Sequence, residues 1–239
     1  MTRRALVAVL AKQRPDIDDP EAAIAAGEVQ VDGAVVTNPK SQVREDARIV
    51  VKPLKGLKGE AKLAAGLDAL GGYEFSLKVA LDVGASTGGF TTEMLRRGAV
   101  KVFAVDAGHG QLMGSLRQDE RVVNLENTNA ADLSVELIPD PIDVVTIDVS
   151  YSPLRAIVPG VTVAVAFAPA ATMFALVKPM FELHAAVLPT RADDLAEAVR
   201  TAESAVIAAG WTLENTVESP LRGNAGAVEY FIRATLHSG

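Results

Sequence analysis

Cysteine is missing altogether from the 239-residue sequence. Disulfides and thiolate metal sites are therefore excluded, and nothing argues for an oxidising compartment. Aromatic residues make up only 5% of the chain, so the core has to rest on Ala, Val, Leu and Ile. The three histidines, His109, His184 and His237, lie far apart in the sequence and lack the spacing of metal ligands. We therefore expect no bound metal.

Positive charge is scarce, and no apolar run is both long and uninterrupted. The formal net charge is −7, which is unfavourable for binding nucleic acid over a broad face. Residues 156–177 are uncharged and long enough to cross a bilayer, but Pro159, Gly160 and Pro169 interrupt them. A short helix followed by a buried parallel strand explains this run better. The apolar run at residues 5–11 is short and has no cleavage site after it, so we expect no membrane partner and a cytoplasmic location.

The pattern of turns and periodicity predicts two parts. Residues 1–53 predict two helices followed by short strands, with a tight hairpin at Asp32-Gly33, which together form a small α+β module. Residues 54–60, rich in Lys and Gly, are interpreted as a linker. From residue 61 to 239 helices and strands alternate. This alternation predicts an α/β fold, Rossmann-like, with a mostly parallel sheet and helices on both faces.

The stretch ALDVGASTGGF, residues 80–90, is an apolar run that stops at Asp82 and opens into a loop of small residues. It differs from the dinucleotide pattern G-x-G-x-x-G and lacks the Lys-Ser/Thr that ends a P-loop. Gly84 and Gly88 would let a ligand approach the backbone. Asp106 ends the next strand, where a carboxylate can accept hydrogen bonds from a ribose diol. These acids favour S-adenosylmethionine, which carries a sulfonium, an ammonium and no phosphate; an NAD-type site and a ligand-free turn remain alternatives.

Five motifs occur in a fixed order: STGGF at 86–90, VDAGHGQL at 105–112, IDVS at 147–150, LVKPMFE at 176–182 and VEYF at 228–231. Together they resemble the TlyA branch of the FtsJ-like methyltransferases, over nearly the whole chain. The resemblance implies a seven-strand methyltransferase sheet, with residues 1–53 as an RNA-binding-type module like that of ribosomal protein S-four. It also implies S-adenosylmethionine-dependent 2′-O-methylation of ribosomal RNA, with the ribosomal subunit as partner. The implied donor site comprises Asp82, Gly84, Ala85, Ser86, Thr87, Gly88, Gly89, Phe90, Asp106, Ala107, Asn127 and Asp148.

The family carries a Lys-Asp-Lys-Glu tetrad, which the resemblance places at Lys62, Asp148, Lys178 and Glu229. A ribose hydroxyl is a weak acid, so a base must take its proton as the methyl group arrives. We expect Lys178 to be that base, Lys62 to favour its neutral form, and the two carboxylates to orient the lysines. The sequence after Asp148 lacks the paired prolines of many base-modifying enzymes, which favours oxygen over nitrogen as the acceptor.

The sequence departs from the family on the acceptor side. In residues 1–54, eight Lys and Arg are balanced by eight Asp and Glu, whereas family modules are typically basic. Asp18-Asp19 stands where the family has Ser-Arg, and the glycine-rich loop that follows KPQFE in the family is missing after Glu182. A retained RNA-binding strip would comprise Arg3, Arg4, Lys12, Arg14, Lys55 and Lys58.

Two alternatives therefore stay open. The first is a methyltransferase for a small, natural-product-like acceptor, with a closed pocket beside Lys178. The second is a non-catalytic RNA- or ribosome-binding protein that keeps the donor pocket.

Overall fold

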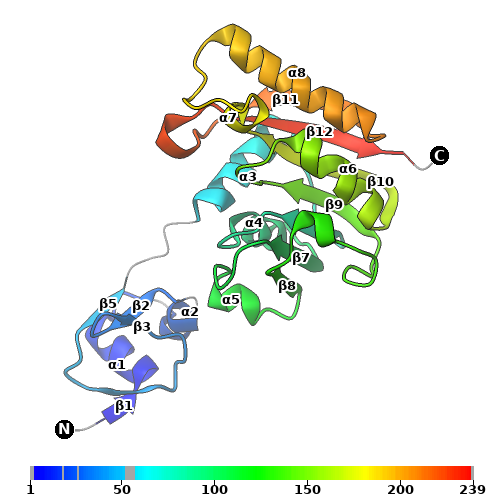
Figure 1. The fold of residues 1–239 in the computed structure, drawn as a ribbon. Helices are drawn as coiled ribbons and strands as arrows, with labels where there is room; N and C mark the ends of the chain where they lie inside the picture. Colours follow the sequence, from blue (N-terminus) through cyan, green and yellow to red (C-terminus); the bar gives the residue numbers. More distant parts are fainter. Residues whose placement is uncertain (1–2, 18, 26, 52–56, 238–239) are drawn as a thin grey trace. The chain divides into compact units, whose positions relative to one another are not determined.

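The computed structural model describes residues 3–17, 19–25, 27–51 and 57–237. The chain divides into two compact units, residues 1–57 and 58–239 (Figure 1). Each unit has its own buried apolar cluster.

The N-terminal unit is a small α+β module. Its elements are β1 (Arg3–Ala5), α1 (Leu6–Gln13), α2 (Pro20–Ala25), β2 (Val29–Val31), β3 (Ala34–Val35), β4 (Gln42–Arg44) and β5 (Ile49–Val51). The predicted hairpin joins β2 and β3, and Asp32 and Gly33 both have positive φ, as a two-residue turn of type I′ requires. The first helix starts later than its apolar pattern indicates, because residues 3–5 pair with β4. Leu6, Leu10 and Ile24 are fully buried between the helices and the strands.

The larger unit is built on one seven-stranded sheet. Its elements are α3 (Lys58–Ala69), β6 (Val79–Val83), α4 (Gly89–Arg96), β7 (Lys101–Asp106), α5 (Gly114–Arg117), β8 (Val122–Glu126), η1 (Ala130–Asp132), β9 (Ile142–Ile147), α6 (Leu154–Ala164), β10 (Phe167–Val177), α7 (Pro179–Glu182), α8 (Ala192–Ala208), β11 (Thr212–Glu218), η2 (Asn224–Gly226) and β12 (Tyr230–Leu236). The strand order is β11-β12-β10-β9-β6-β7-β8. Strands β6 to β10 are parallel, and β12 lies antiparallel between β10 and β11.

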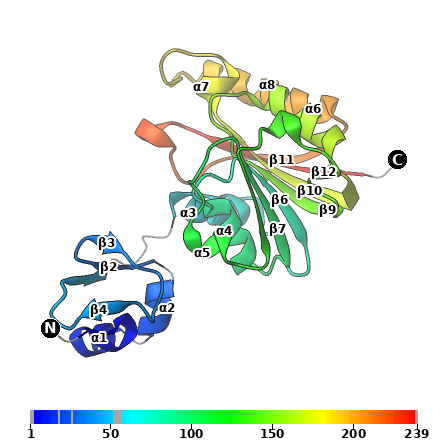
Figure 2. The same cartoon turned by 60° about the horizontal axis from the view of Figure 1, so that its bottom comes forward.

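Helices cover both faces of this sheet, as the alternating pattern predicts (Figures 1 and 2). Leu81 packs with residues of α6 and α8 on one face, whereas its neighbour Ala80 packs with residues of α3, α4 and α5 on the other. The neighbours alternate because successive side chains of a strand point to opposite faces.

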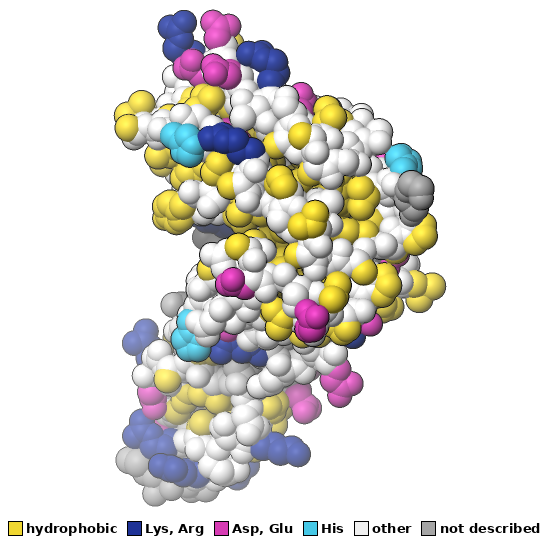
Figure 3. All heavy atoms as spheres, turned by 45° about the vertical axis from the view of Figure 1, so that its right-hand side comes forward, with side chains coloured by type: hydrophobic (Ala, Val, Ile, Leu, Met, Phe, Trp, Pro, Cys, Tyr) yellow, Lys and Arg dark blue, Asp and Glu magenta, His cyan; other side chains and the backbone are white. Residues whose placement is uncertain are grey.

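The uncharged stretch folds as a helix and a strand, α6 and β10, as predicted. Val163 of α6 is 85% exposed, and the face shown in Figure 3 carries many apolar side chains with few charged ones among them. Within the described ranges, the helices are too short or too polar to cross a membrane. Several elements differ from expectation: β1, β4, β8, α5 and α7 were not predicted, and α3 starts at Lys58, within the predicted linker. Strand β8 was missed because VVNLE mixes apolar and polar residues.

Strands β6 and β9 approach each other closely where the strand order reverses. Asp148 donates its backbone N–H to the carbonyl of Val83 at 2.9 Å. Gly84 has φ +92°, and a Cβ at this position would lie 2.3 Å from the carbonyl oxygen of Asp148. Only glycine therefore fits at this position. Ligands of open α/β sheets bind at such a reversal, beyond the carboxyl ends of the strands.

Asp82 is fully buried below the loop that follows β6. Its two carboxylate oxygens accept hydrogen bonds from the hydroxyls of Thr91, at 2.6 Å, and Thr146, at 2.9 Å. Burial raises the pKa of Asp82 from 3.8 to about 6, although both hydroxyls oppose the rise. Asp82 therefore ties β6 to α4 and β9.

Asp82 should make stability fall as the pH rises. Because its pKa is higher in the folded state, its contribution is fully present below pH 4 and is lost as the pH rises through about 6. The free energy of unfolding should drop by about 2 kcal/mol between pH 4 and pH 7, relative to Asp82→Asn. Urea denaturation of both proteins across this range measures the difference, and parallel curves would contradict it.

Candidate functional site

A cavity of about 480 Å³ opens at the carboxyl ends of β6, β7 and β9. Its wall includes Gly84, Ser86, Thr128 and Asn129. The charged residues among those that line it are Asp106 and Asp148, with no Lys, Arg or His. This wall therefore favours a cationic ligand over a phosphate.

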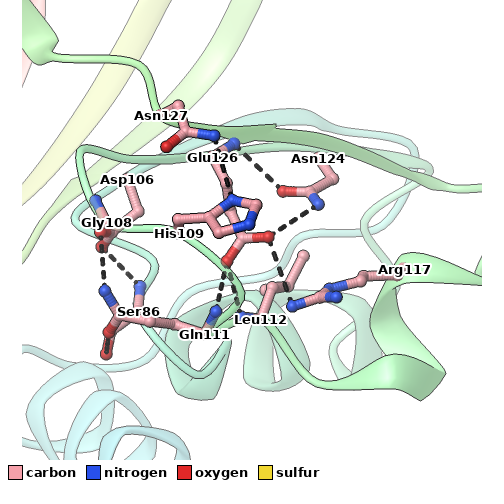
Figure 4. Close-up of polar contacts among 10 residues, drawn as sticks. All are labelled: Ser86, Asp106, Gly108, His109, Gln111, Leu112, Arg117, Asn124, Glu126 and Asn127. Atoms are coloured by element: carbon pink, nitrogen blue, oxygen red, sulfur yellow. Dashed lines mark hydrogen bonds and ion pairs between the residues drawn. The ribbon is translucent and has the colours of Figure 1, made fainter.

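Asp106 organises the loops around this cavity. Its carboxylate accepts the backbone N–H groups of Ser86, at 2.8 Å, and Gly108, at 2.6 Å, together with the side-chain amide of Gln111 at 3.4 Å (Figure 4). A Cβ on Gly108 would lie 1.7 Å from the Gln111 Nε2, so a side chain there would displace the Gln111 amide from Asp106. One carboxylate thus holds the loops after both β6 and β7.

Glu126, at the end of the unpredicted strand β8, braces the same loop from the other side. It accepts the backbone N–H groups of Leu112, at 3.0 Å, and Gln111, at 2.5 Å, and lies 3.4 Å from the Arg117 guanidinium (Figure 4). The hydrogen bond from the Leu112 N–H, supported by that of Gln111, lowers the pKa of Glu126 to about 2. Glu126 therefore stays ionised and fixes the loop, and it does not line the cavity.

The structure separates the predicted donor residues into two groups. Those that line the cavity are Gly84, Ser86, Asp106, Ala107 and Asp148. Those that do not are Asp82, Ala85, Thr87, Gly88, Gly89, Phe90 and Asn127.

The second group supports the loop through packing. Gly88 caps α4 with φ +93°, and a Cβ there would lie 2.1 Å from Leu116. Phe90 stacks on Phe231 with 6.2 Å between ring centroids. Asn127 contacts the His109 ring at 3.1 Å (Figure 4). Small or apolar residues suit both close packing and contact with a ligand. The loop pattern alone therefore does not distinguish residues that pack from residues that face a ligand.

Several residues that line the cavity were not predicted: Gln111, Thr128, Asn129, Tyr151 and Ser152 among them. Thr128 and Asn129 follow the end of β8, and Tyr151 and Ser152 follow the end of β9. The carboxyl ends of parallel strands meet at one edge, so their positions after these strands were the available signal.

A second, smaller cavity of about 120 Å³ adjoins the first and shares Ser150 and Tyr151 with it. Its wall includes Lys178, Glu229, Met180, Phe181, Leu188, Pro189, Asn224 and Val228. Tyr151 has φ 69°, is 89% exposed, and lies 5.4 Å from the Phe181 ring between centroids. An exposed aromatic ring therefore stands where the two cavities meet.

The four predicted tetrad residues form two ion pairs. Lys178 Nζ lies 2.6 Å from Asp148 Oδ1 and donates a hydrogen bond to the Ser150 hydroxyl at 3.1 Å. Lys62 Nζ lies 2.5 Å from Glu229 Oε2. Lys178 follows Val177, which pairs across the sheet with Tyr230, and Glu229 directly precedes Tyr230. The antiparallel pairing of β10 and β12 thus brings together residues about fifty positions apart, and both line the smaller cavity.

The predicted RNA-binding cations of the N-terminal unit are partly neutralised. Arg4 forms an ion pair with Glu45, and Arg14 makes two hydrogen bonds to Asp16, at 2.8 and 2.6 Å. Arg3, Lys12 and Lys58 are exposed, and Lys58 begins α3. Lys55, and Asp18 of the Asp-Asp pair, lie outside the described residues.

The comparison with known proteins gives one family and several relatives. The family model for FtsJ-like methyltransferases matches residues 58–235. The "16S/23S rRNA (cytidine-2'-O)-methyltransferase TlyA" of Mycobacterium tuberculosis is 36% identical over 226 residues, which cover 87% of this chain and 80% of that protein. "Hemolysin A" of Brachyspira hyodysenteriae is 35% identical over 217 residues, covering 87% and 88%.

A solved structure of a hemolysin-named protein from Streptococcus thermophilus covers all of this chain and 90% of that one, with a TM-score of 0.72 and 26% identity. A similar structure from Lactococcus lactis covers 77% and 89%, with a TM-score of 0.71 and 29% identity. Since the family model spans most of the chain, and the sheet order and paired cavities fit it, the chain belongs to the FtsJ-like methyltransferase family.

Proposed function

We propose that this enzyme transfers the methyl group of S-adenosylmethionine to a ribose 2′-hydroxyl of ribosomal RNA. The observation that carries the proposal is the pair of adjoining cavities, with Asp148 in the wall of one, Lys178 and Glu229 in the wall of the other, and the ion pairs Lys178–Asp148 and Lys62–Glu229. The name of the M. tuberculosis relative describes a ribosomal RNA cytidine-2′-O-methyltransferase. Residues 1–53 then serve as an RNA-binding module of the ribosomal protein S-four type, and residues 61–239 as the methyltransferase domain.

The larger cavity fits S-adenosylmethionine. Asp106 lies where β7 ends, within reach of a ribose diol, and its loops expose backbone groups without a crowding Cβ. Asp106 and Asp148 supply negative charge for a ligand that carries a sulfonium and an ammonium, and the described residues that line the cavity include no Lys, Arg or His. When bound, the donor supplies an electrophilic methyl group.

The smaller cavity fits the acceptor. Lys178 is held by Asp148 and Ser150, and in its neutral form it would take the proton from the ribose hydroxyl as the new bond forms. Glu229 lines the same cavity and holds the Lys62 ammonium, a second positive charge that would stabilise the charge developing on the oxygen. Tyr151 offers an exposed ring face on which a nucleobase can stack.

One observation supports a second candidate, a small hydroxylated acceptor. The neutralised arginines of the N-terminal unit weaken the case for phosphate binding, and Leu188 and Pro189 form part of the wall of the acceptor cavity. Ribosomal RNA remains the favoured substrate, because the similarity to the M. tuberculosis enzyme covers 87% of the chain and so extends over both units. A ribosome-modifying role also implies a cytoplasmic location.

Replacing Lys178 by Ala should abolish transfer while leaving donor binding intact. Loss of a general base lowers the rate by about 10²–10⁴-fold. Purified ribosomal subunits and labelled donor measure the rate, and calorimetry measures donor affinity. Lys101→Ala is the matched control. Lys101 is the first residue of β7, at the end of the strand opposite to Asp106, and it forms an ion pair with Asp140. Donor binding by the wild type with no transfer to RNA would favour the small acceptor.

Replacing Asp106 by Ala should weaken donor binding by roughly tenfold to a hundredfold. The change leaves the N–H groups of Ser86 and Gly108 without their acceptor and removes one of two carboxylates from the wall. Asp140 pairs with Lys101 at the start of β7, whereas Asp106 ends that strand. The control variant Asp140→Ala, which also removes one carboxylate, should therefore bind the donor normally. Calorimetry at one ionic strength compares the variants, and an unchanged affinity for Asp106→Ala would refute the assignment.

The double variant Asp16→Asn, Glu45→Gln should bind ribosomal RNA more tightly and with a steeper salt dependence. It releases Arg14 and Arg4 for phosphates, and each new phosphate contact adds about 0.9 to the slope of log affinity against log salt for duplex nucleic acid. The control Asp119→Asn, Asp193→Asn removes the same charge from the other unit. Equal slopes for the two double variants would show that the N-terminal unit does not contact RNA.

A further inference from the structure

The acceptor cavity is lined by four stretches of the chain, and two of them follow the neighbouring strands β9 and β10. The segment after β9, residues 148–155, carries Asp148, Ser150 and Tyr151. The segment after β10, residues 178–184, carries Lys178 and Phe181. The strands fix where each segment begins, but the spacing between the segments beyond the sheet depends on contacts between them.

Glu182, the last residue of α7, supplies the central contact. It is only 4% exposed, and its Oε1 accepts the backbone N–H of Leu154 at 2.7 Å. Leu154 is the first residue of α6, and the preceding Pro153 provides no side-chain cap for this helix. A carboxylate from a separate segment therefore takes the place of the missing cap and also favours the positive end of the helix.

The segment after β9 makes return contacts. Arg155 donates to the backbone carbonyl of Glu182 at 2.9 Å and lies 2.5 Å from Nε2 of His184. The rings of Tyr151 and Phe181 meet on the cavity side. We call this set the α6–α7 clasp; it comprises Tyr151, Leu154, Arg155, Phe181, Glu182 and His184.

Burying the carboxylate of Glu182 costs free energy, so its presence indicates a specific role in the folded structure. Its second oxygen, Oε2, is buried with no hydrogen-bond partner among the described residues. Burial raises the pKa of Glu182 above its usual value, against the opposing effects of the Leu154 N–H and Arg155. An apolar side chain would fill this position without that cost, but it could not accept the N–H of Leu154.

We propose that Glu182 is a positioning residue for methyl transfer, which sets the distance between the wall that carries Asp148, Ser150 and Tyr151 and the wall that carries Lys178. The inference rests on the proposed function, because it assigns Lys178 to the reaction. In-line transfer depends on the alignment of base, hydroxyl and methyl group, and a displacement of about 1 Å can cost roughly a hundredfold in rate. Glu182 acts through the backbone of α6 and does not touch the reacting atoms.

Three variants test the clasp. Glu182→Ala removes the acceptor for Leu154, whereas Glu182→Gln keeps a carbonyl oxygen in its place. Glu93→Ala is the matched control, because Glu93 is also a fully buried carboxylate and holds Arg96 and Arg97 in α4, away from both cavities. All three are compared at a temperature at which each is fully folded.

We expect Glu182→Ala to lower kcat on ribosomal subunits by about 10–100-fold with a smaller change in donor affinity. Glu182→Gln should restore most of the rate, and Glu93→Ala should keep it despite a lower Tm. Equal kcat for Glu182→Ala and the wild type, or equal losses for Glu182→Ala and Glu93→Ala, would overturn the positioning role.

Amide hydrogen exchange gives a second readout that does not need activity. Glu182→Ala should speed exchange in residues 150–155 and 178–184 together, and Glu93→Ala should not. Unchanged exchange in these segments would refute the clasp. If the wild type transfers no methyl group to RNA, the proposed function fails, and the exchange measurement still decides whether the clasp exists.

Discussion

The site depends on one close approach, that of Gly84 to the backbone of Asp148 at the reversal of strand order. At this point β6 and β9 lie side by side, while the chains that leave them turn in different directions. A side chain on residue 84 would force the two strand ends apart. Because Asp148 borders the donor cavity and also pairs with Lys178, the same approach joins the two cavities. The geometry of donor and acceptor therefore follows from the absence of a single Cβ.

The two cavities differ in the charged residues that line them. The donor side combines Asp106 and Asp148 with an absence of cations from its wall, which suits a positively charged ligand. On the acceptor side each lysine has its own carboxylate, so both ammonium groups can be partly buried at moderate cost. Asp148 belongs to both sides, since it lines the donor cavity and holds Lys178. One carboxylate thus links the wall of the larger cavity to the lysine of the smaller one.

Much of this architecture could be predicted from the sequence. The alternating pattern gave the α/β class, Asp32-Gly33 gave the hairpin, and the uncharged stretch folded as a helix and a strand. The strand β8 was not predicted because its sequence mixes polar and apolar residues. The role of Glu126, which ends this strand, was therefore not predicted either. The glycines of STGGF gave no way to distinguish residues that face a ligand from residues that pack, because both demands select small side chains. The pairing of Lys178 with Asp148 follows from the strand order, which periodicity alone does not specify.

The departures from the family now have a place in the structure. The residues that hold the lysines and the donor loops come from strand ends, where the sheet fixes them. The residues that differ, Leu188 and Pro189 in place of a glycine-rich loop, lie on the outer wall of the acceptor cavity. The arginines of the N-terminal unit are paired with acids from its own surface. The departures therefore fall on a loop in the wall of the smaller cavity and on the N-terminal unit, whereas Lys178 and Asp148 lie at strand ends. Because the sheet holds Lys178 and a loop carries Leu188 and Pro189, the loop can differ between relatives while the Lys178–Asp148 pair keeps its geometry.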